Sequence, residues 1–295
     1  MDPEILKKET KNLEAIIGKL EPKGGEIPQL NGIDIYGKTL PLHGIGGGDH
    51  LIWMDFKKRY DLKARIKEAK LVGVREKLKL NKTRGGILIA DVEGHEITDA
   101  FTASSLHHAF LTGALYELER YGEITTHLFE NLNTRFYSTS TIDNKNKSFT
   151  MLYGEISREG IFRYISAAHQ MPLVFSEKEN KIIDLSETQM KASIPIGFMP
   201  SKKNIDAKKN HSSLGLKEEY EVNELKLENK GDMCVLFTDG LEDHFGDSFK
   251  ETLSGILRDA KNLTSKGIYN RVNRTIDDYG KPKDDISYVI IKKNK

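Results

Sequence analysis

The sequence has almost no cysteine: Cys234 is the only one in 295 residues, so an intramolecular disulfide is excluded. No apolar run approaches the roughly 20 residues needed to span a bilayer. The first fifteen residues also lack the apolar core of a secretory signal. A net charge of +1 gives no global reason to expect nucleic acid or a membrane as a partner. Together these absences predict a soluble, cytoplasmic protein.

The length of the chain fits one large domain or two ordinary ones. Residues 3–20 have the spacing of a helix with a partly apolar stripe, and a stretch rich in proline and glycine follows them. We expect residues 1–30 to form an N-terminal helix and linker. This helix either serves as a docking, regulatory or homodimerising segment or folds back onto the body. We expect residues 31–295 to form the main domain.

Short runs with strand character dominate the main domain, and many are joined by tight turns, which favours antiparallel pairing. Three longer stretches, at about 98–121, 124–138 and 248–263, have helical periodicity. Strands grouped with helices in this way indicate an α+β fold in which helices cover sheets. The predicted strands are 33–40, 50–56, 85–92, 149–157, 161–168, 171–176, 181–186, 233–240 and 286–293.

One region is strongly basic. Residues 57–84 contain 12 Lys or Arg against three Asp or Glu, a local excess of nine, so the remainder of the chain carries about −8 (1 − 9). Leu62, Ile66 and Ala69 have helical spacing. The segment is either a solvated insertion or a basic arm for a phosphorylated or acidic partner. It has no interleaved aromatic residue beyond Tyr60, which argues against a groove for single-stranded nucleic acid.

Aspartates recur at the ends of predicted strands. Asp91 and Asp239 each end an apolar strand, Asp284 and Asp285 open another, and Asp49 precedes a third. One such aspartate is usually a turn residue or a helix cap. Hard divalent cations bind carboxylate oxygens, and a site for two of them needs several acids that converge at one end of a rigid sheet. The recurrence therefore predicts such a site, and the flanking glycines would allow close backbone approach.

Six motifs follow one another along the chain: GIGGGDHLIWMDF, IADVEGHE, ISAAHQMPLVF, IPIGF, LFTDGLED and DDISYVII. Their order resembles that of the metal-dependent PPM serine/threonine protein phosphatases, with the bacterial SpoIIE/RsbU-like branch nearest. The resemblance covers about residues 12–293. It implies an αββα sandwich, in which two stacked antiparallel β-sheets are flanked by helices, with two or more Mn²⁺ or Mg²⁺ ions at one end.

The resemblance also implies roles for individual residues. Asp91 would bridge the two metals, the Val92 carbonyl would complete one shell, and Asp239 would hold the second ion together with Asp284. Asp49 would lie in the outer shell or help to bind a weaker ion. Asp285 would have a supporting role.

Two histidines accompany these acids. His95, in EGHE, could orient other groups, protonate the leaving serine alkoxide or hydrogen-bond the turn. With Asp91 and Asp239 it completes the set of candidate catalytic residues. We expect His169 to pack behind the site.

The chain departs from the family pattern in several places. Ala90, Glu93 and Glu96 change the usual G-D-V-x-G-H-G, and SAAH replaces NAGH. The basic segment is longer than the usual hairpin connection, so we expect it to act as a lid or a partner-docking element. Glu93 adds a carboxylate beside the implied metals, and Glu96 places a charged side chain where the helix begins. These changes could raise metal affinity, narrow substrate access or mark an impaired enzyme.

The resemblance implies metal-dependent hydrolysis of phosphoserine or phosphothreonine in a protein. The implied substrate is an anti-sigma-factor antagonist in a bacterial partner-switching pathway, and an upstream activator protein is also implied. The alternative is a catalytically silent module with the phosphatase fold, which binds or regulates a phosphoprotein. No nucleic-acid or membrane partner is expected.

Overall fold

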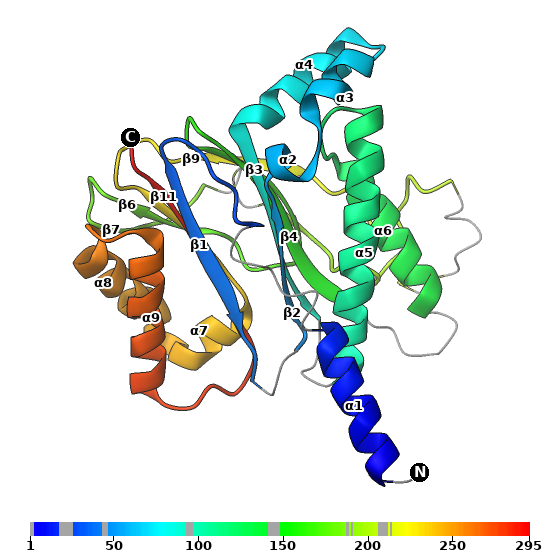
Figure 1. Ribbon diagram of the computed structural model, residues 1–295. Coiled ribbons are helices and arrows are strands. Elements are labelled where there is room, and N and C mark those ends of the chain that lie inside the picture. Colours follow the sequence, from blue (N-terminus) through cyan, green and yellow to red (C-terminus); the bar gives the residue numbers. More distant parts are fainter. Residues whose placement is uncertain are drawn as a thin grey trace.

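The protein is built from two β-sheets packed face to face, with helices on both outer sides (Figure 1). The computed structural model describes residues 3–17, 26–42, 47–92, 97–140, 148–186, 189, 191–205, 212 and 214–295. The strand pairs are antiparallel except for β5 and β8, which are parallel. This arrangement confirms the predicted α+β sandwich.

The first sheet has the strand order β1-β11-β10-β6-β7, and the second has the order β2-β3-β4-β5-β8, with β9 paired to β5. The first sheet comprises β1 (Ile33–Leu40), β11 (Ile286–Lys293), β10 (Met233–Phe237), β6 (Leu173–Ser176) and β7 (Lys181–Ile183). The second comprises β2 (Asp49–Met54), β3 (Arg84–Val92), β4 (Phe149–Ser157), β5 (Ile161–Ala167), β8 (Ala192–Ser193) and β9 (Val222–Lys226).

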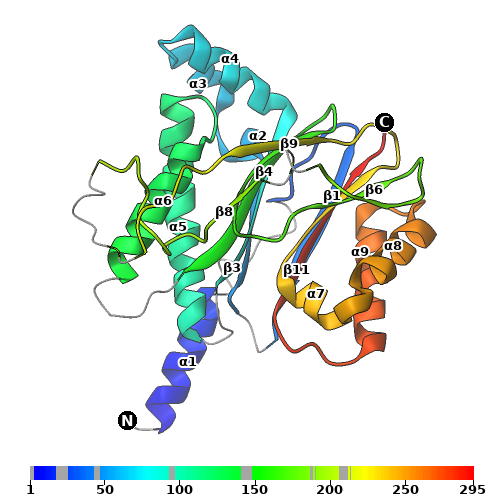
Figure 2. The same cartoon turned by 180° about the vertical axis from the view of Figure 1, so that it is seen from behind.

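Helices cover the outer face of each sheet, as the two opposite views show (Figures 1 and 2). The first sheet is covered by α7 (Asp239–Phe245), α8 (Phe249–Ala260) and α9 (Ser265–Tyr279), and the second by α5 (Ile97–Arg120) and α6 (Thr126–Ser140). Helix α1 (Pro3–Ile17) extends away from the sandwich. Among the described residues no helix is both long and apolar enough to cross a membrane.

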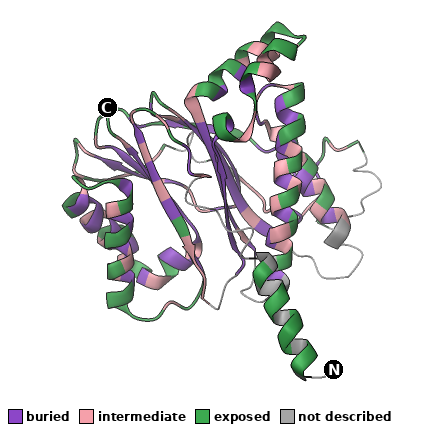
Figure 3. Ribbon diagram, viewed as in Figure 1, coloured by how far each residue is buried: buried purple, intermediate pink, exposed green. Residues whose placement is uncertain are grey.

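The core has one apolar layer between the sheets and one under each set of helices. Strand β2 shows how the layers are filled: Leu51 and Trp53 face the first sheet, whereas Ile52 and Met54 face α5. Every residue of β2 is buried, because a sheet covered on both faces has no solvated side. Figure 3 shows this buried centre and the exposed outer surfaces of the helices.

Some elements were not predicted. Helix α9 is polar overall, but Ile268, Val272 and Ile276 recur every four residues and are buried against the first sheet. Thr264 caps its first turn by accepting a hydrogen bond from the Gly267 N–H. The capping threonine and this spacing were the available signals. The short elements α7, β8 and β9 had weaker patterns.

The basic segment, which connects β2 to β3 in the sequence, forms a layer of short helices. It consists of α2 (Phe56–Arg59), α3 (Leu62–Glu68), α4 (Val72–Leu80) and a short 3₁₀ turn (Asn81–Thr83). Asp55 caps α2 and Asp61 caps α3, each by accepting hydrogen bonds from backbone N–H groups.

The position of this layer is incompatible with a lid over the predicted metal site. Strands β2 and β3 are paired from Asp49↔Asp91 to Met54↔Gly86. The helical layer connects to the two strands at the Met54↔Gly86 pair. That pair is five residues, or about 17 Å along the strands, from the Asp49↔Asp91 pair. The expectation of a lid was therefore wrong, because the helices occupy the opposite end of the sheet.

Candidate metal centre and active site

The strand ends bring the five predicted aspartates to one end of the sandwich. Asp49 begins β2 and lies opposite Asp91, near the end of β3. Asp239 begins α7 directly after β10, and Asp284 and Asp285 immediately precede β11. Because β10 and β11 are antiparallel neighbours, the end of one lies beside the start of the other.

A threonine joins the two sheets at this end. The Thr238 hydroxyl donates to the Asp49 carboxylate over 2.8 Å, and it accepts from the Ser287 N–H over 2.9 Å. All three residues are buried. The contact holds Asp49 of the second sheet against β10 and β11 of the first. Thr238 was missed in the sequence, where the signal was a hydroxyl residue between an apolar strand and Asp239.

Asp285 has a structural part in the same junction. Its carboxylate accepts from the Gly48 N–H at 2.8 Å and from the Leu42 N–H at 2.7 Å. A Cβ at Gly240 would lie 2.0 Å from the Asp285 carbonyl oxygen, and a Cβ at Gly47 would lie 1.7 Å from its carboxylate. Only glycine fits at both positions, because the backbone approaches Asp285 too closely for a side chain.

The carboxylates repel one another. Burial, followed by the charges of Asp239, Asp284 and Asp285, raises the pKa of Asp91 to about 7. Burial raises the pKa of Asp239 as well, as does the charge of Asp284, and Asp91 and Asp239 share a side-chain hydrogen bond. The pKa of Asp49 lies well above its ordinary value because of burial and then of Asp91. None of the five forms an ion pair with a described lysine or arginine.

The donor chemistry fits a hard divalent cation, although the described side chains do not by themselves enclose one. In the described ranges no group of three or more histidines, cysteines or acids is arranged to hold a metal ion. Asp49 and Asp285 accept hydrogen bonds from distant segments, whereas among the described residues the exposed Asp284 accepts only from the adjacent Asp285 N–H. Asp91, Asp239 and Asp284 are therefore the carboxylates best placed to bind. Their mutual repulsion is the kind that a cation relieves.

The remaining predicted site residues have different positions. Val92 is the buried last residue of β3, and its N–H donates to the Gly48 carbonyl at 3.2 Å. His95 lies outside the described residues, as do Glu93 and Glu96.

His169 lies beside the acids. The Thr150 hydroxyl and the His169 Nδ1 are 2.8 Å apart, and Thr150 lies opposite Asp91 in the β3–β4 pair. His169 Nε2 is buried with no hydrogen-bond partner, and burial lowers the pKa of the ring to about 3. The preceding Ala168 adopts a positive φ of 54°, a conformation that favours glycine. This is the position at which the NAGH pattern has its glycine.

A pair of histidines that was not predicted, His50 and His107, lies on the other face of β2. His50 Nε2 and His107 Nδ1 are 2.9 Å apart, and His107 belongs to α5. Burial lowers the pKa of His50 to about 3 and that of His107 to about 4. Neighbouring strand residues point to opposite faces, so His50 faces α5 although Asp49 precedes it.

The same fold occurs in solved PP2C-type phosphatases. The SiaA PP2C domain of Pseudomonas aeruginosa is 16% identical with a TM-score of 0.61, over 98% of each chain. The RsbU and RsbW domains of Rv1364c from Mycobacterium tuberculosis are 19% identical with a TM-score of 0.58, over 91% of this chain and 62% of that one. A structure of RsbX in complex with magnesium is 13% identical with a TM-score of 0.54, over 90% and 98%. The fold is therefore that of a PP2C (PPM) phosphatase.

A family comparison identifies the branch. The family described as Stage II sporulation protein E (SpoIIE) matches residues 81–294. The match covers well over half of the 295 residues, and the chain belongs to the SpoIIE family. This confirms the resemblance that the ordered motifs indicate. Comparison with curated proteins gives no match.

Proposed function

We propose that the protein is a divalent-cation-dependent phosphatase that hydrolyses phosphoserine or phosphothreonine in a protein substrate. The observation that carries the proposal is the crowding of Asp91, Asp239 and Asp284, which raises the pKa of Asp91 and Asp239 with no paired cation among the described residues. Family membership and the magnesium in the RsbX structure support the same reading.

In this proposal Asp91, Asp239, Asp284 and the Val92 carbonyl would hold two or more Mn²⁺ or Mg²⁺ ions. Asp49, fixed by Thr238, supports the site from behind. Asp285 orders the adjoining backbone through its hydrogen bonds. Divalent cations bound there supply Lewis-acid stabilisation of the phosphoryl charge and make the attacking water more acidic. The protein chiefly positions the reacting groups, as phosphoryl transfer requires. His95 is the proposed acid for the leaving alkoxide.

The proposed substrate is a phosphorylated anti-sigma-factor antagonist, and an activator protein is proposed to act upstream. The presence of RsbU together with RsbW in the M. tuberculosis chain supports this kind of partner-switching system. Helix α1 is proposed as a homodimerising or regulatory segment, which its position away from the sandwich supports (Figure 3). Replacing the exposed Ile5 by Glu would then lower the dimer fraction in light scattering.

A catalytically silent module is the second candidate. The observation that favours it is that the described side chains include no three-ligand cluster. It predicts a folded protein that binds a phosphoprotein without hydrolysing it.

The discriminating experiment measures phosphate release from a phosphoserine peptide and from p-nitrophenyl phosphate, with and without Mn²⁺. Wild type should show Mn²⁺-dependent release that Asp239→Asn abolishes and that Asp247→Asn, an exposed control just beyond α7, retains. Absence of release in folded wild type, with retained binding of the phosphopeptide, would favour the silent module.

A further inference from the structure

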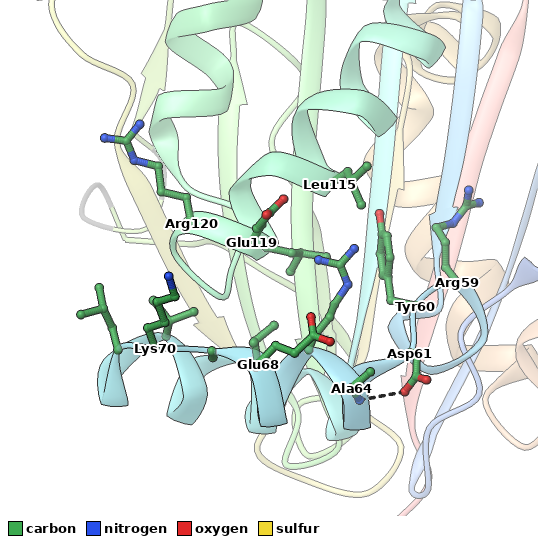
Figure 4. A pocket seen from close by; sticks show the side chains of 15 residues that line it. Arg59, Tyr60, Asp61, Ala64, Glu68, Lys70, Leu115, Glu119 and Arg120 are labelled. Atoms are coloured by element: carbon green, nitrogen blue, oxygen red, sulfur yellow. Dashed lines mark hydrogen bonds between the residues drawn. The ribbon is translucent and has the colours of Figure 1, made fainter.

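A groove lies between the basic helical layer and α5, far from the carboxylates. Its volume is about 820 Å³, and α3, α4 and the C-terminal half of α5 form its walls. Figure 4 shows Leu115 and Glu119 of α5 on one side and Ala64 and Glu68 of α3 on the other. The remaining apolar lining is supplied by Ala69, Leu71, Val74, Leu78 and Leu118.

The groove exposes apolar surface. The Leu71 and Leu115 side chains are 67% and 38% exposed, and each lines the groove. Exposed apolar side chains gathered around a groove, with charged residues at its rim, mark an interaction site.

The groove lining has four basic and three acidic residues, a net charge of +1 (4 − 3), and lies against the basic segment. The basic residues are Arg59, Arg65, Lys70 and Arg120. The acids there are Glu68, Glu119 and Asp61, which also caps α3. No ion pair involving Arg65, Lys70 or Arg120 occurs among the described residues. Residues 57–84 carry a net charge of +9, so the field around the groove attracts an acidic partner.

An apolar groove between helices is the usual receptor for one face of an amphipathic helix. Helix α1 of a second copy is a poor occupant, because its three Glu and three Lys residues leave it without net charge. Single-stranded nucleic acid fits poorly as well. Tyr60 is the only aromatic residue in the lining, and the Arg65 guanidinium already lies over its ring, 5.2 Å from the centroid.

We propose that this groove binds an acidic amphipathic helix of a partner protein. The inference goes beyond the proposed phosphatase activity and does not depend on it, because the groove lies at the other end of β2 and β3 from the acids. The helices α2 to α4 also precede the residues that match the SpoIIE family, which begin at residue 81.

The test is selection from a phage-displayed library of random 16-residue peptides against the full-length protein. Enriched peptides should carry apolar residues spaced i, i+3 or i+4, and i+7, with Asp and Glu between them. Each is then made with a fluorescent label, and its Kd is measured by anisotropy. A scrambled peptide of the same composition, which breaks the apolar stripe, should bind at least tenfold more weakly.

Two double variants in the groove, each with a matched control double variant elsewhere, locate the binding site. Leu71→Glu with Leu115→Glu should weaken binding at least tenfold, whereas Leu214→Glu with Leu216→Glu, at exposed leucines outside the groove, should not. Arg65→Glu with Lys70→Glu should weaken binding similarly and reduce its salt dependence. The control pair is Lys178→Glu with Lys250→Glu, at exposed lysines elsewhere. Circular dichroism and p-nitrophenyl phosphate turnover should be unchanged in all four.

Several outcomes would overturn the proposal. These are enrichment of basic peptides or of none, equal weakening in the control pairs, or equal affinity for the scrambled peptide. Loss of oligomerisation in the groove variants without any peptide dependence would assign the groove to a second copy instead. Variant-dependent binding of single-stranded DNA or of vesicles containing anionic lipid, without selection of acidic helices, would assign it to those partners.

Discussion

The two ends of the β2–β3 pair carry opposite charge. At the Asp49↔Asp91 end, five carboxylates meet without a paired cation among the described residues. At the Met54↔Gly86 end, the connection is a helical layer with a net charge of +9 around an apolar groove. The strands between them are buried and fully paired.

The two ends of the β2–β3 pair are held together by different kinds of contact. The acid end is assembled from residues distant in sequence, and close backbone contacts and cross-sheet hydrogen bonds hold them in place. The basic end is one continuous segment whose helices are capped locally by Asp55 and Asp61. Substitutions at the acid end should therefore disturb several elements at once, whereas those at the basic end should act locally.

The largest expected effect is on metal binding. Asp91→Asn removes the carboxylate proposed to hold both ions, so the affinity for Mn²⁺, measured by electron paramagnetic resonance, should fall at least about 100-fold. Asp247→Asn should leave it unchanged. Chelation with EDTA should abolish turnover, and Mn²⁺ should restore it. Unchanged Mn²⁺ affinity in Asp91→Asn would show that the two ends do not differ in the way proposed.

A glycine-to-alanine substitution should change the free energy of unfolding in opposite directions at the two ends. At Gly240 the new Cβ would meet the Asp285 carbonyl at 2.0 Å, so Gly240→Ala should lower the free energy of unfolding by about 3 kcal/mol. At Gly73, in α4, nothing lies within 4 Å, and Gly73→Ala should raise it by about 0.5–1 kcal/mol. Urea denaturation measures both. Similar values for the two variants would contradict the contrast.

Removing the threonine hydroxyl tests the link between the sheets. Thr238→Val keeps the shape of the side chain but removes one hydrogen bond from the Asp49 carboxylate and leaves the Ser287 N–H without its acceptor. The free energy of unfolding should fall by about 1–3 kcal/mol. Thr275→Val, on α9, removes a hydroxyl that donates to a helix carbonyl and should change it by less than about 0.5 kcal/mol. A small effect at Thr238 would mean that the sheets are held together mainly by apolar packing.

Acid sensitivity should depend on His169. Its pKa is about 3 when folded, below the ordinary 6.5, so the unfolded chain binds the extra proton between these values. The contribution of His169 to the free energy of unfolding therefore decreases as the pH falls from about 6.5 toward 3, by about 1.4 kcal/mol per pH unit. His169→Leu should remove this contribution, giving a smaller loss than wild type between pH 6 and 5 in urea titrations. An identical loss would show that His169 takes up its proton without unfolding.

The smallest expected effect is at Ala168. Its positive φ strains a residue with a side chain, so Ala168→Gly should raise the free energy of unfolding by about 0.5–1 kcal/mol. The neighbouring Ala167 is buried at the end of β5 with ordinary backbone, and Ala167→Gly should lower it by about 1 kcal/mol. Thermal unfolding distinguishes the two signs. A loss of stability in Ala168→Gly would contradict the strain.

Much of the fold could be predicted because local pattern determined it. The strands β4 and β11 match their predicted ranges, since apolar and β-branched residues form uninterrupted runs between turn residues. Helix α9 was missed because its buried face holds few apolar residues and its exposed face is highly polar.

The acids of the candidate site could be singled out for a different reason, namely that aspartates recur at strand ends. Their supporting contacts could not be predicted, because they join residues distant in sequence. Thr238 and Asp49 lie 189 residues apart, and Gly48 and Asp285 lie 237 apart. Nothing in the local sequence indicates which residues become neighbours across the sandwich.

The helical layer leaves and re-enters the second sheet at adjacent strands that are already paired in register, from Met54 to Gly86. A connection between two strands that are already paired is a suitable site for inserting another domain. A fluorescent protein or a ligand-binding domain should be tolerated at the exposed connection between α3 and α4, at Lys70 and Leu71, with the strands on either side keeping their partners. Leu62 and Leu78 of the layer must stay, because they are buried in the core. In such chimaeras the inserted domain would lie at the opposite end of β2 and β3 from the aspartates. Any effect of its ligand on phosphatase activity would then have to be transmitted along these two strands.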